Sequence, residues 1–279
     1  MGKKALRLDE IGYWSEGKLE IVRKYALAYS TILSKQGVIK RHIYVDAFAG
    51  AGTHISETTG QEVAGSPMNA MGITPPFSEL HFIDLDGTRA AELRRLSAAD
   101  RRVRVHKGDC NEILLDHVFP RCKYEDYHRA LCLLDPYGLN VNWEVLRTAG
   151  AMKSVEVFYN FMIMDANMNV FMRDSSKVPP EQAARMDAVC GDRSWREAAY
   201  RSTPGLFGDI DEKVSNEAIA EWFRQRLKNV AGFTYVPPPI PMRNRKRAVV
   251  YYLYFASPNR EGAKIVGEIF DKYRSKGAA

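Results

Sequence analysis

Short apolar runs alternate along the chain with segments in which apolar residues recur every three or four positions. Within residues 17–36 this spacing places Val22, Ala26 and Tyr29 on one face of a helix. The next run, 42–47, is rich in β-branched and aromatic residues, as is typical of strands. The same alternation predicts strands at 80–83, 103–105, 130–134 and 155–161, and helices at 66–71, 87–98, 111–119 and from residue 143. The first half therefore predicts a doubly wound α/β sheet.

The alternation changes after the fifth predicted strand. Residues 163–212 contain several short helical pieces, which we interpret as a helical insertion on one side of the sheet. A helix at 215–230 is followed by strands at 233–236 and 249–255, and a last helix begins near Pro258. Because no helix separates the last two strands, we expect them to be antiparallel. The pattern predicts a mostly parallel, seven-stranded, Rossmann-like sheet with an antiparallel last strand.

The length of the chain suits one such sheet with its covering helices. We expect residues 1–279 to form a single domain, with residues 1–38 as an N-terminal helical extension. Segment 53–65 is polar, contains glycine and is longer than most connections between a strand and a helix. It is either a functional lid or an irregularly packed segment.

The composition is that of an ordinary globular protein, with 46% hydrophobic and 27% charged residues. No apolar run approaches the roughly 20 residues that a membrane-spanning helix needs. The first residues, from Met1 to Arg7, lack an apolar signal core. We expect a cytoplasmic protein with no membrane partner.

The four cysteines form no C-x-x-C pair. Cys110, His117, Cys122 and His128 lie close in sequence, but their spacing fits no common zinc template. We therefore expect no metal site and interpret the cysteines as reduced thiols.

The net charge of +6 permits a nucleic-acid partner without requiring one. Basic residues concentrate at 101–107 and at 243–247, and such runs are more often solvated surfaces than binding sites. The second cluster is the better candidate for contacts with substrate phosphates. Its basic residues are Arg243, Arg245, Lys246 and Arg247.

Acidic residues stand at the ends of four successive predicted strands. They are Asp46, Asp84, Asp109 and Asp135. The carboxyl ends of parallel strands lie along one rim of the sheet, where ligands of open α/β sheets bind. Gly50 and Gly52 follow the first of these strands and let a ligand approach the backbone. One such aspartate is more often a turn or cap residue, but four of them beside a glycine turn predict a nucleoside site.

Two other nucleotide sites are disfavoured. A dinucleotide fingerprint needs a small residue where this chain has Ile55. A phosphate loop needs a Gly-Lys-Ser/Thr sequence, which does not follow Gly52.

The segment from Asp46 through Phe48 and Gly50 to Gly52 resembles the first motif of class I S-adenosylmethionine-dependent methyltransferases. This resemblance implies S-adenosylmethionine as the cofactor. It also implies that Asp84 holds the ribose and that Asp109 contacts the adenine. No metal is needed for such a transfer.

A second resemblance covers nearly the whole chain and concerns the three-Cys-motif partner protein family. The residues that carry it are Trp14, Lys18-Leu19, Tyr25 and Tyr29, Tyr44-Val45-Asp46-Ala47-Phe48-Ala49-Gly50, Gly65-Ser66-Pro67, Leu134-Asp135-Pro136-Tyr137-Gly138 and Tyr252-Leu253-Tyr254-Phe255-Ala256-Ser257. The family is named for a companion protein that bears the cysteines. A three-Cys-motif protein is therefore an expected partner.

The stretch Asp135-Pro136-Tyr137 resembles the motif with which amino-methylating nucleic-acid enzymes hold the target amine. The resemblance implies that these three residues are catalytic. Gly138 stands where the family has its aromatic residue, so Tyr137 either stacks on a flipped base or packs at the strand end. Asn160, at the end of the next strand, is a candidate for substrate binding or a turn cap.

The leading hypothesis is an S-adenosylmethionine-dependent methyltransferase that acts on an amine of a DNA or RNA base. One alternative is a non-catalytic or accessory nucleoside-binding module that works with a three-Cys-motif partner protein. Another is a methyltransferase of a protein or a small molecule.

Overall fold

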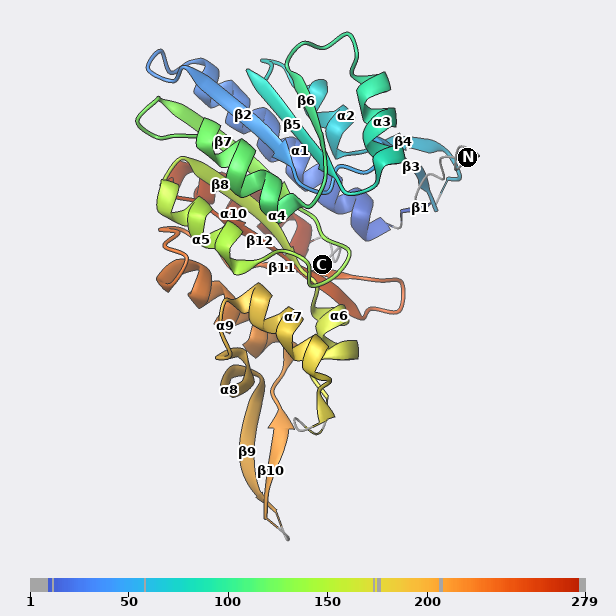
Figure 1. Ribbon diagram of the computed structural model, residues 1–279, viewed down its shortest axis with the longest axis vertical. Coiled ribbons are helices and arrows are strands. Elements are labelled where there is room, and N and C mark those ends of the chain that lie inside the picture. The colour runs from blue at the N-terminus through green and yellow to red at the C-terminus, as the bar shows by residue number, and fades with distance from the viewer. Residues whose placement is uncertain are drawn as a thin grey trace.

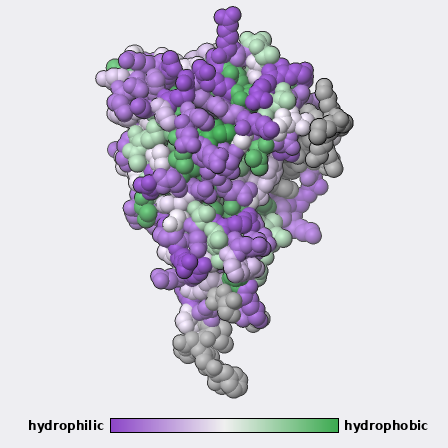
Figure 2. All heavy atoms as spheres, viewed as in Figure 1, coloured by the Kyte–Doolittle hydropathy of each residue, from purple (hydrophilic) through white to green (hydrophobic). Residues whose placement is uncertain are grey.

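The computed structural model describes residues 10–275, except Gly12, Thr58, Arg173, Ser175, Ser176, Leu206 and Phe207. A twisted sheet covered by helices forms the body, and α6, α7, α8, β9 and β10 lie at one end of it (Figure 1). No helix in the described part is long and apolar enough to cross a membrane. The surface seen in Figure 2 is mostly hydrophilic, with hydrophobic residues in scattered groups.

Seven strands form the central sheet in the order β11-β12-β8-β7-β2-β5-β6. Their bounds are β2 Arg41–Asp46, β5 Glu79–Asp84, β6 Val103–Lys107, β7 His128–Leu134, β8 Val155–Phe161, β11 Ile240–Arg243 and β12 Val249–Ala256. The strands from β6 to β8 are parallel, whereas β12 runs antiparallel to both β8 and β11. The predicted fold class, including the antiparallel last strand, is confirmed.

The position predicted for the sixth strand was wrong. Residues 233–236 make only one isolated bridge, between Tyr235 and Ser257, and the edge strand is β11. Pro237 to Pro239 have no N–H groups to donate, so a ladder forms only beyond them. Phe233 and Val236 are buried without joining a ladder, which explains why their apolar character indicated a strand.

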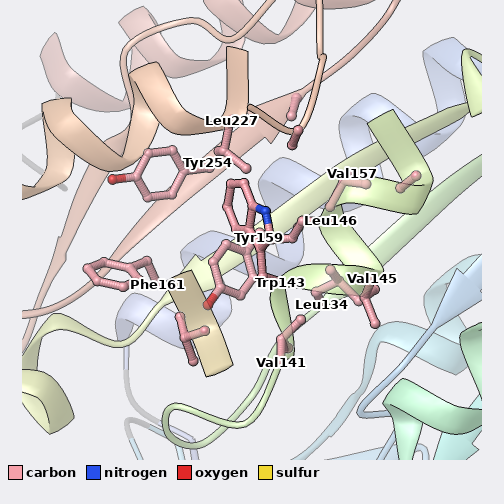
Figure 3. Packing of buried hydrophobic residues seen from close by; sticks show 14 of the residues in the cluster. Leu134, Val141, Trp143, Val145, Leu146, Val157, Tyr159, Phe161, Leu227 and Tyr254 are labelled. Carbon is pink, nitrogen blue, oxygen red and sulfur yellow. The ribbon is translucent and has the colours of Figure 1, made fainter. Parts of the chain in front are cut away.

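Helices cover both faces of the sheet. The helices α1 (Tyr13–Ser34), α2 (Ser66–Met71), α3 (Gly87–Leu96) and α10 (Arg260–Ser275) pack on one face. The other face is covered by α4 (Cys110–Ile113), a π-helical turn (Leu114–Val118), a 3-10 turn (Phe119–Arg121), α5 (Trp143–Met152) and α9 (Asn216–Asn229). Figure 3 shows Trp143 and Tyr159 packed together on this second face. Because both faces are buried, the central strands β7 and β8 are mostly apolar.

The prediction of a helical insertion was only partly correct, because the inserted segment also contains two strands. After α6 (Ile163–Asn169), α7 (Pro180–Cys190) and α8 (Trp195–Ala199), the chain forms the antiparallel strands β9 (Tyr200–Gly205) and β10 (Gly208–Lys213). This hairpin projects from the body in Figure 1. At its base the Tyr200 hydroxyl donates a hydrogen bond to the Met172 carbonyl at 2.9 Å. This contact is between residues far apart in sequence, so local periodicity could not indicate it.

Segment 53–65 is neither irregular nor unpaired. It forms the strands β3 (Thr53–Ser56) and β4 (Glu62–Ala64), and β3 also pairs with β1 (Glu10–Ile11). The Ser56 hydroxyl donates to the Glu16 carboxylate at 2.6 Å. The hairpin is therefore held against the first turns of α1, next to the rim that carries the aspartates.

Candidate active site

The turn after β2 is built from bare backbone. Gly50 and Gly52 have φ angles of 64° and 91°, which L side chains rarely adopt. The Gly50 amide donates to the Asp84 carboxylate at 2.9 Å. The second oxygen of this carboxylate accepts from the Asp86 amide at 2.8 Å. Asp84 thus joins the ends of β2 and β5 and fixes the position of the glycine turn.

Asp84 still has acceptor capacity for a ligand. A carboxylate offers about four lone-pair sites, and the two backbone amides use two of them. The residue is largely buried, and burial raises its pKa. Its place fits the predicted contact with ribose hydroxyls.

Asp46 lies deeper, at 0% exposure. Its Oδ1 accepts from the Phe48 amide at 3.2 Å, while its Oδ2 is buried and has no hydrogen-bond partner among the described residues. Burial is the main cause that raises its pKa to about 7, and the nearby carboxylate of Asp135 adds to the rise. The Phe48 ring is partly buried against the core. An unpaired carboxylate oxygen beside a glycine turn fits a ligand that brings N–H or O–H donors.

Asp135 directly follows β7 and accepts hydrogen bonds from two nitrogen groups. Its Oδ2 accepts from the Lys18 ammonium, and its Oδ1 accepts from the side-chain amide of Asn160. The Lys18 side chain is 8% exposed and that of Asp135 is 25% exposed, so the pair is largely shielded from water. The Lys18 ammonium also lies 5.8 Å from the centre of the Tyr251 ring. Asn160 therefore orients Asp135, and its own Oδ1 is buried without a partner among the described residues.

Lys18 is the site residue that the sequence analysis missed, although it occurs in the motif quoted above. It lies three and four positions before Ile21 and Val22, which are both buried. A lysine on the buried face of an amphipathic helix requires a partner. That position was the available signal, but it could not name Asp135 as the partner.

The other predicted residues of the rim differ in exposure. Asp109 is exposed and caps α4, accepting from the Asn111 amide at 2.8 Å. Its contact with adenine stays a prediction. Pro136 is buried, whereas Tyr137 is 68% exposed. The stacking of its ring on a base stays a prediction.

Gly138 departs from the aromatic residue of the motif for a packing reason. A Cβ atom at this position would lie 2.6 Å from Oδ2 of Asp165. That oxygen accepts from the Leu139 amide at 2.8 Å and pairs with Arg185 at 2.9 Å. The loop after β7 is thus held against α6 and α7 by hydrogen bonds, which leaves no room for a larger residue at position 138.

The basic loop lies on the rim of the aspartates. β12 runs antiparallel to β8, with Tyr252 opposite Phe161, so the start of β12 lies beside the carboxyl end of β8. The loop joins β11 to β12 there, and its residues Arg245, Lys246 and Arg247 are exposed. Arg243, the last residue of β11, is half-buried at the start of the loop. Arg245 lies 3.6 Å from the Glu57 carboxylate, in the hairpin of β3 and β4. Among the described residues, no three His, Cys, Asp or Glu side chains are grouped as metal ligands.

Known proteins resemble the chain in structure only. No protein-family model matches it, and no curated protein matches it in sequence. Protein LPL1258 from Legionella pneumophila has a TM-score of 0.50 at 10% identity, with 91% of this chain and 90% of that chain covered. A putative S-adenosylmethionine-dependent methyltransferase from Listeria monocytogenes has a TM-score of 0.41 at 11% identity, covering 84% and 97%. An S-adenosylmethionine-dependent methyltransferase from Clostridium acetobutylicum also has 0.41, at 10% identity and covering 86% and 91%.

The chain has a Rossmann-like sheet of seven strands that is mostly parallel, with β12 antiparallel to its neighbours. At such low identities the likeness concerns the fold alone. In this sheet, the glycine turn, Asp84, Asp46 and Asp135 all lie at the carboxyl ends of parallel strands. The sequence motifs that pointed to the cofactor are therefore brought to one rim.

Proposed function

We propose that the chain is an enzyme that transfers a methyl group from S-adenosylmethionine to an amine of a nucleic acid. The observation that supports this most strongly is the Asp135 carboxylate, which accepts hydrogen bonds from an ammonium and from an amide NH2. Asp135 also interacts electrostatically with Asp46 at the glycine turn. A carboxylate that accepts hydrogen bonds from N–H donors beside a nucleoside site is suited to hold an amine that receives the methyl group.

The residues present fit the cofactor. The unpaired oxygens of Asp46 and Asn160 are acceptors for N–H and O–H groups, and Asp84 has lone pairs left for ribose hydroxyls. Bound S-adenosylmethionine supplies an electrophilic methyl group on a sulfonium. The backbone of Gly50 and Gly52 admits the ligand closely, because no Cβ atoms stand in the way.

The roles of the protein are mainly positioning. Asp135 accepts a hydrogen bond from an N–H group of the substrate amine, which turns the lone pair of the amine nitrogen toward the methyl group. Lys18 and Asn160 fix the plane of this carboxylate. When the amine becomes methylated, its surplus proton passes to Asp135. Tyr137 stacks on the base that carries the amine.

The basic loop favours nucleic acid as the substrate. Arg243, Arg245, Lys246 and Arg247 lie on the rim that carries Asp135, and only Arg245 among them forms an ion pair with a carboxylate in the described part. Cations that lack acidic partners beside the site can bind backbone phosphates.

Cofactor binding is tested by thermal melting with S-adenosylmethionine in large excess. A ligand that binds only the native state must raise its melting temperature. Asp84→Ala should abolish the rise. The matched control is Asp86→Asn, which changes an exposed aspartate two residues away but keeps an acceptor for the cap of α3. No rise with the wild type would reject the cofactor, and a rise that survives in Asp84→Ala would reject the ribose contact.

Acceptor binding is tested by neutralising the four basic residues of the loop to Gln. Binding to RNA or DNA should weaken, and its dependence on salt should become shallower by roughly one phosphate contact per cation lost. The control is the same charge change at Arg94 and Arg95 of α3, at Arg101 before β6 and at Lys272 of α10, which lie outside the basic loop and the aspartate rim. Equal effects of the two variants would show that net charge alone matters and would remove the nucleic-acid claim.

A second candidate is an accessory role with a three-Cys-motif protein. The observation that favours it is that Lys18 and Asn160 already use two of the roughly four acceptor sites of Asp135, which leaves fewer for an amine from a substrate. Transfer of labelled methyl groups to mixed DNA, RNA and protein should be measured with and without the companion protein. Activity of the chain alone that is lost in Asp135→Ala supports the enzyme. Activity that persists unchanged in Asp135→Ala contradicts the role of this carboxylate.

A further inference from the structure

A cavity lies at the rim opposite to the aspartates. It has a volume of about 740 Å³ and is bordered by the second half of α1, the segments before β7 and β8, and the start of α10. The loops that precede β2 and β7 lie together at the left of Figure 1, and the Lys40 amide donates to the Tyr127 carbonyl between them at 3.1 Å. These are the amino ends of the parallel strands. The cavity is thus separated from the methyltransferase-like site by the length of the sheet.

The cavity is electropositive. Arg129, Lys153 and Arg260 line it, and none of the three forms an ion pair with a carboxylate within the described residues. Arg129 donates to the His128 carbonyl at 2.7 Å, and Lys153 to the Gly232 carbonyl at 2.5 Å. Backbone carbonyls hold these cations in place without neutralising them. Such an arrangement attracts an anion.

The single acid of the described lining is engaged within the protein. Glu156 is 5% exposed and accepts hydrogen bonds from the hydroxyls of Tyr25 and Ser257, the latter at 2.9 Å. Burial raises its pKa to about 7, so its negative charge is partly removed at neutral pH. It therefore opposes an anion only weakly. Nearby, the Tyr29 hydroxyl is buried and has no hydrogen-bond partner among the described residues.

Aromatic rings complete the cavity. Tyr124 is 52% exposed, and the Arg129 guanidinium lies 3.9 Å from the centre of its ring. Tyr235 lines the cavity from the segment after α9. A planar base can stack on such surfaces while its phosphate meets the cations. The volume lies within the range of about 300–1,000 Å³ that small-molecule sites occupy.

We infer that this cavity binds a nucleotide, with the phosphate at Arg129, Lys153 and Arg260 and the base beside Tyr124 and Tyr235. The nucleotide has two sources, a free nucleoside phosphate or one residue of a nucleic-acid strand. This inference does not depend on methyl transfer, because it concerns other residues at the opposite rim.

The test is calorimetric titration with AMP and, separately, with a short single-stranded RNA, both in the presence of saturating S-adenosylhomocysteine. The protein carries Arg243→Gln, Arg245→Gln, Lys246→Gln and Arg247→Gln throughout, so that neither the cofactor site nor the basic loop contributes to binding. The double variant Arg129→Gln/Arg260→Gln should weaken binding by about tenfold or more, as expected when charge-assisted hydrogen bonds are lost. Tyr124→Ala should also weaken it. The matched control, Lys264→Gln/Lys272→Gln, removes two cations of α10 that do not line the cavity and should bind as the wild type does.

The outcomes separate the sources. Binding of AMP but not of RNA assigns a free nucleotide, and the reverse assigns a strand. Unchanged binding in the double variant, or no binding of either probe, would overturn the inference. Competition by inorganic phosphate as strong as that by AMP would also overturn it, because the base would then contribute nothing. Melting curves of the variants verify that each is folded.

Discussion

The buried carboxyl of Asp46 should make the stability of the protein depend on pH, and one substitution can reveal this. The side chain is fully buried, and burial raises its pKa from 3.8 to about 7. The Asp135 carboxylate adds to the rise, whereas the Ser66 side chain, the Phe48 amide and the Lys18 ammonium oppose it. Folding therefore places this group where its ionised form is disfavoured.

The sign and size of the effect follow from linkage. An acid with a raised pKa in the folded state binds its proton more tightly there than in the unfolded chain. Its contribution to stability is fully present below about pH 4 and is lost as the pH rises through about pH 7. One pKa unit corresponds to about 1.4 kcal/mol, so the full shift is worth about 4 kcal/mol. Of this, about 2 kcal/mol is lost between about pH 5 and pH 7.

The assay is urea unfolding of the wild type and of Asp46→Asn at several pH values. The variant cannot ionise at this position, so its free energy of unfolding should gain about 2 kcal/mol relative to the wild type between about pH 5 and pH 7. Asp109→Asn is the control, because it changes an exposed aspartate on the same rim and keeps an oxygen that can cap α4. Parallel curves for Asp46→Asn and the wild type would refute the reasoning.

The remaining predictions concern stability elsewhere in the fold. Burial also raises the pKa of Glu156 to about 7. The free energy of unfolding of Glu156→Gln should therefore lack a similar part of the wild-type pH dependence between about pH 5 and pH 7. A variant curve parallel to the wild-type curve would contradict this. In α5, a Cβ atom on Gly150 would overlap the Ala231 carbonyl oxygen, so Gly150→Ala should lower the free energy of unfolding by about 1–3 kcal/mol in chemical denaturation. In α10, Gly267 faces open space, so Gly267→Ala should raise the free energy of unfolding by about 1 kcal/mol. Equal effects of the two substitutions would show that the backbone contact at Gly150 is not tight.

The strands that proved easiest to predict are those buried on both faces. In β8 the buried residues Val157 and Tyr159 face one helical layer, while Phe158 faces the other. Every position of such a strand must be apolar unless it has a partner, so the run is visible without knowledge of its neighbours. The aspartates at strand ends were visible for the same reason, because each one ends an apolar run.

Short strands at the edges escaped prediction. The register of β3 depends on pairing with β1 and β4, and that of β11 on pairing with β12. Strands of three or four residues carry too few positions for a period to emerge. The hairpin of β9 and β10 was missed because its position is set partly by the contact of Tyr200 with Met172.

The sequence by itself determined the α/β sheet, the glycine turn after β2 and the row of carboxylates along one rim, because each depends on local pattern and chain order. Only the tertiary structure decided which charges meet. Lys18 and Asp135 are 117 positions apart, and nothing in either segment specifies the other. The raised pKa of Asp46 and the cations around the opposite cavity likewise depend on burial and distance, which arise only when helices pack onto the sheet.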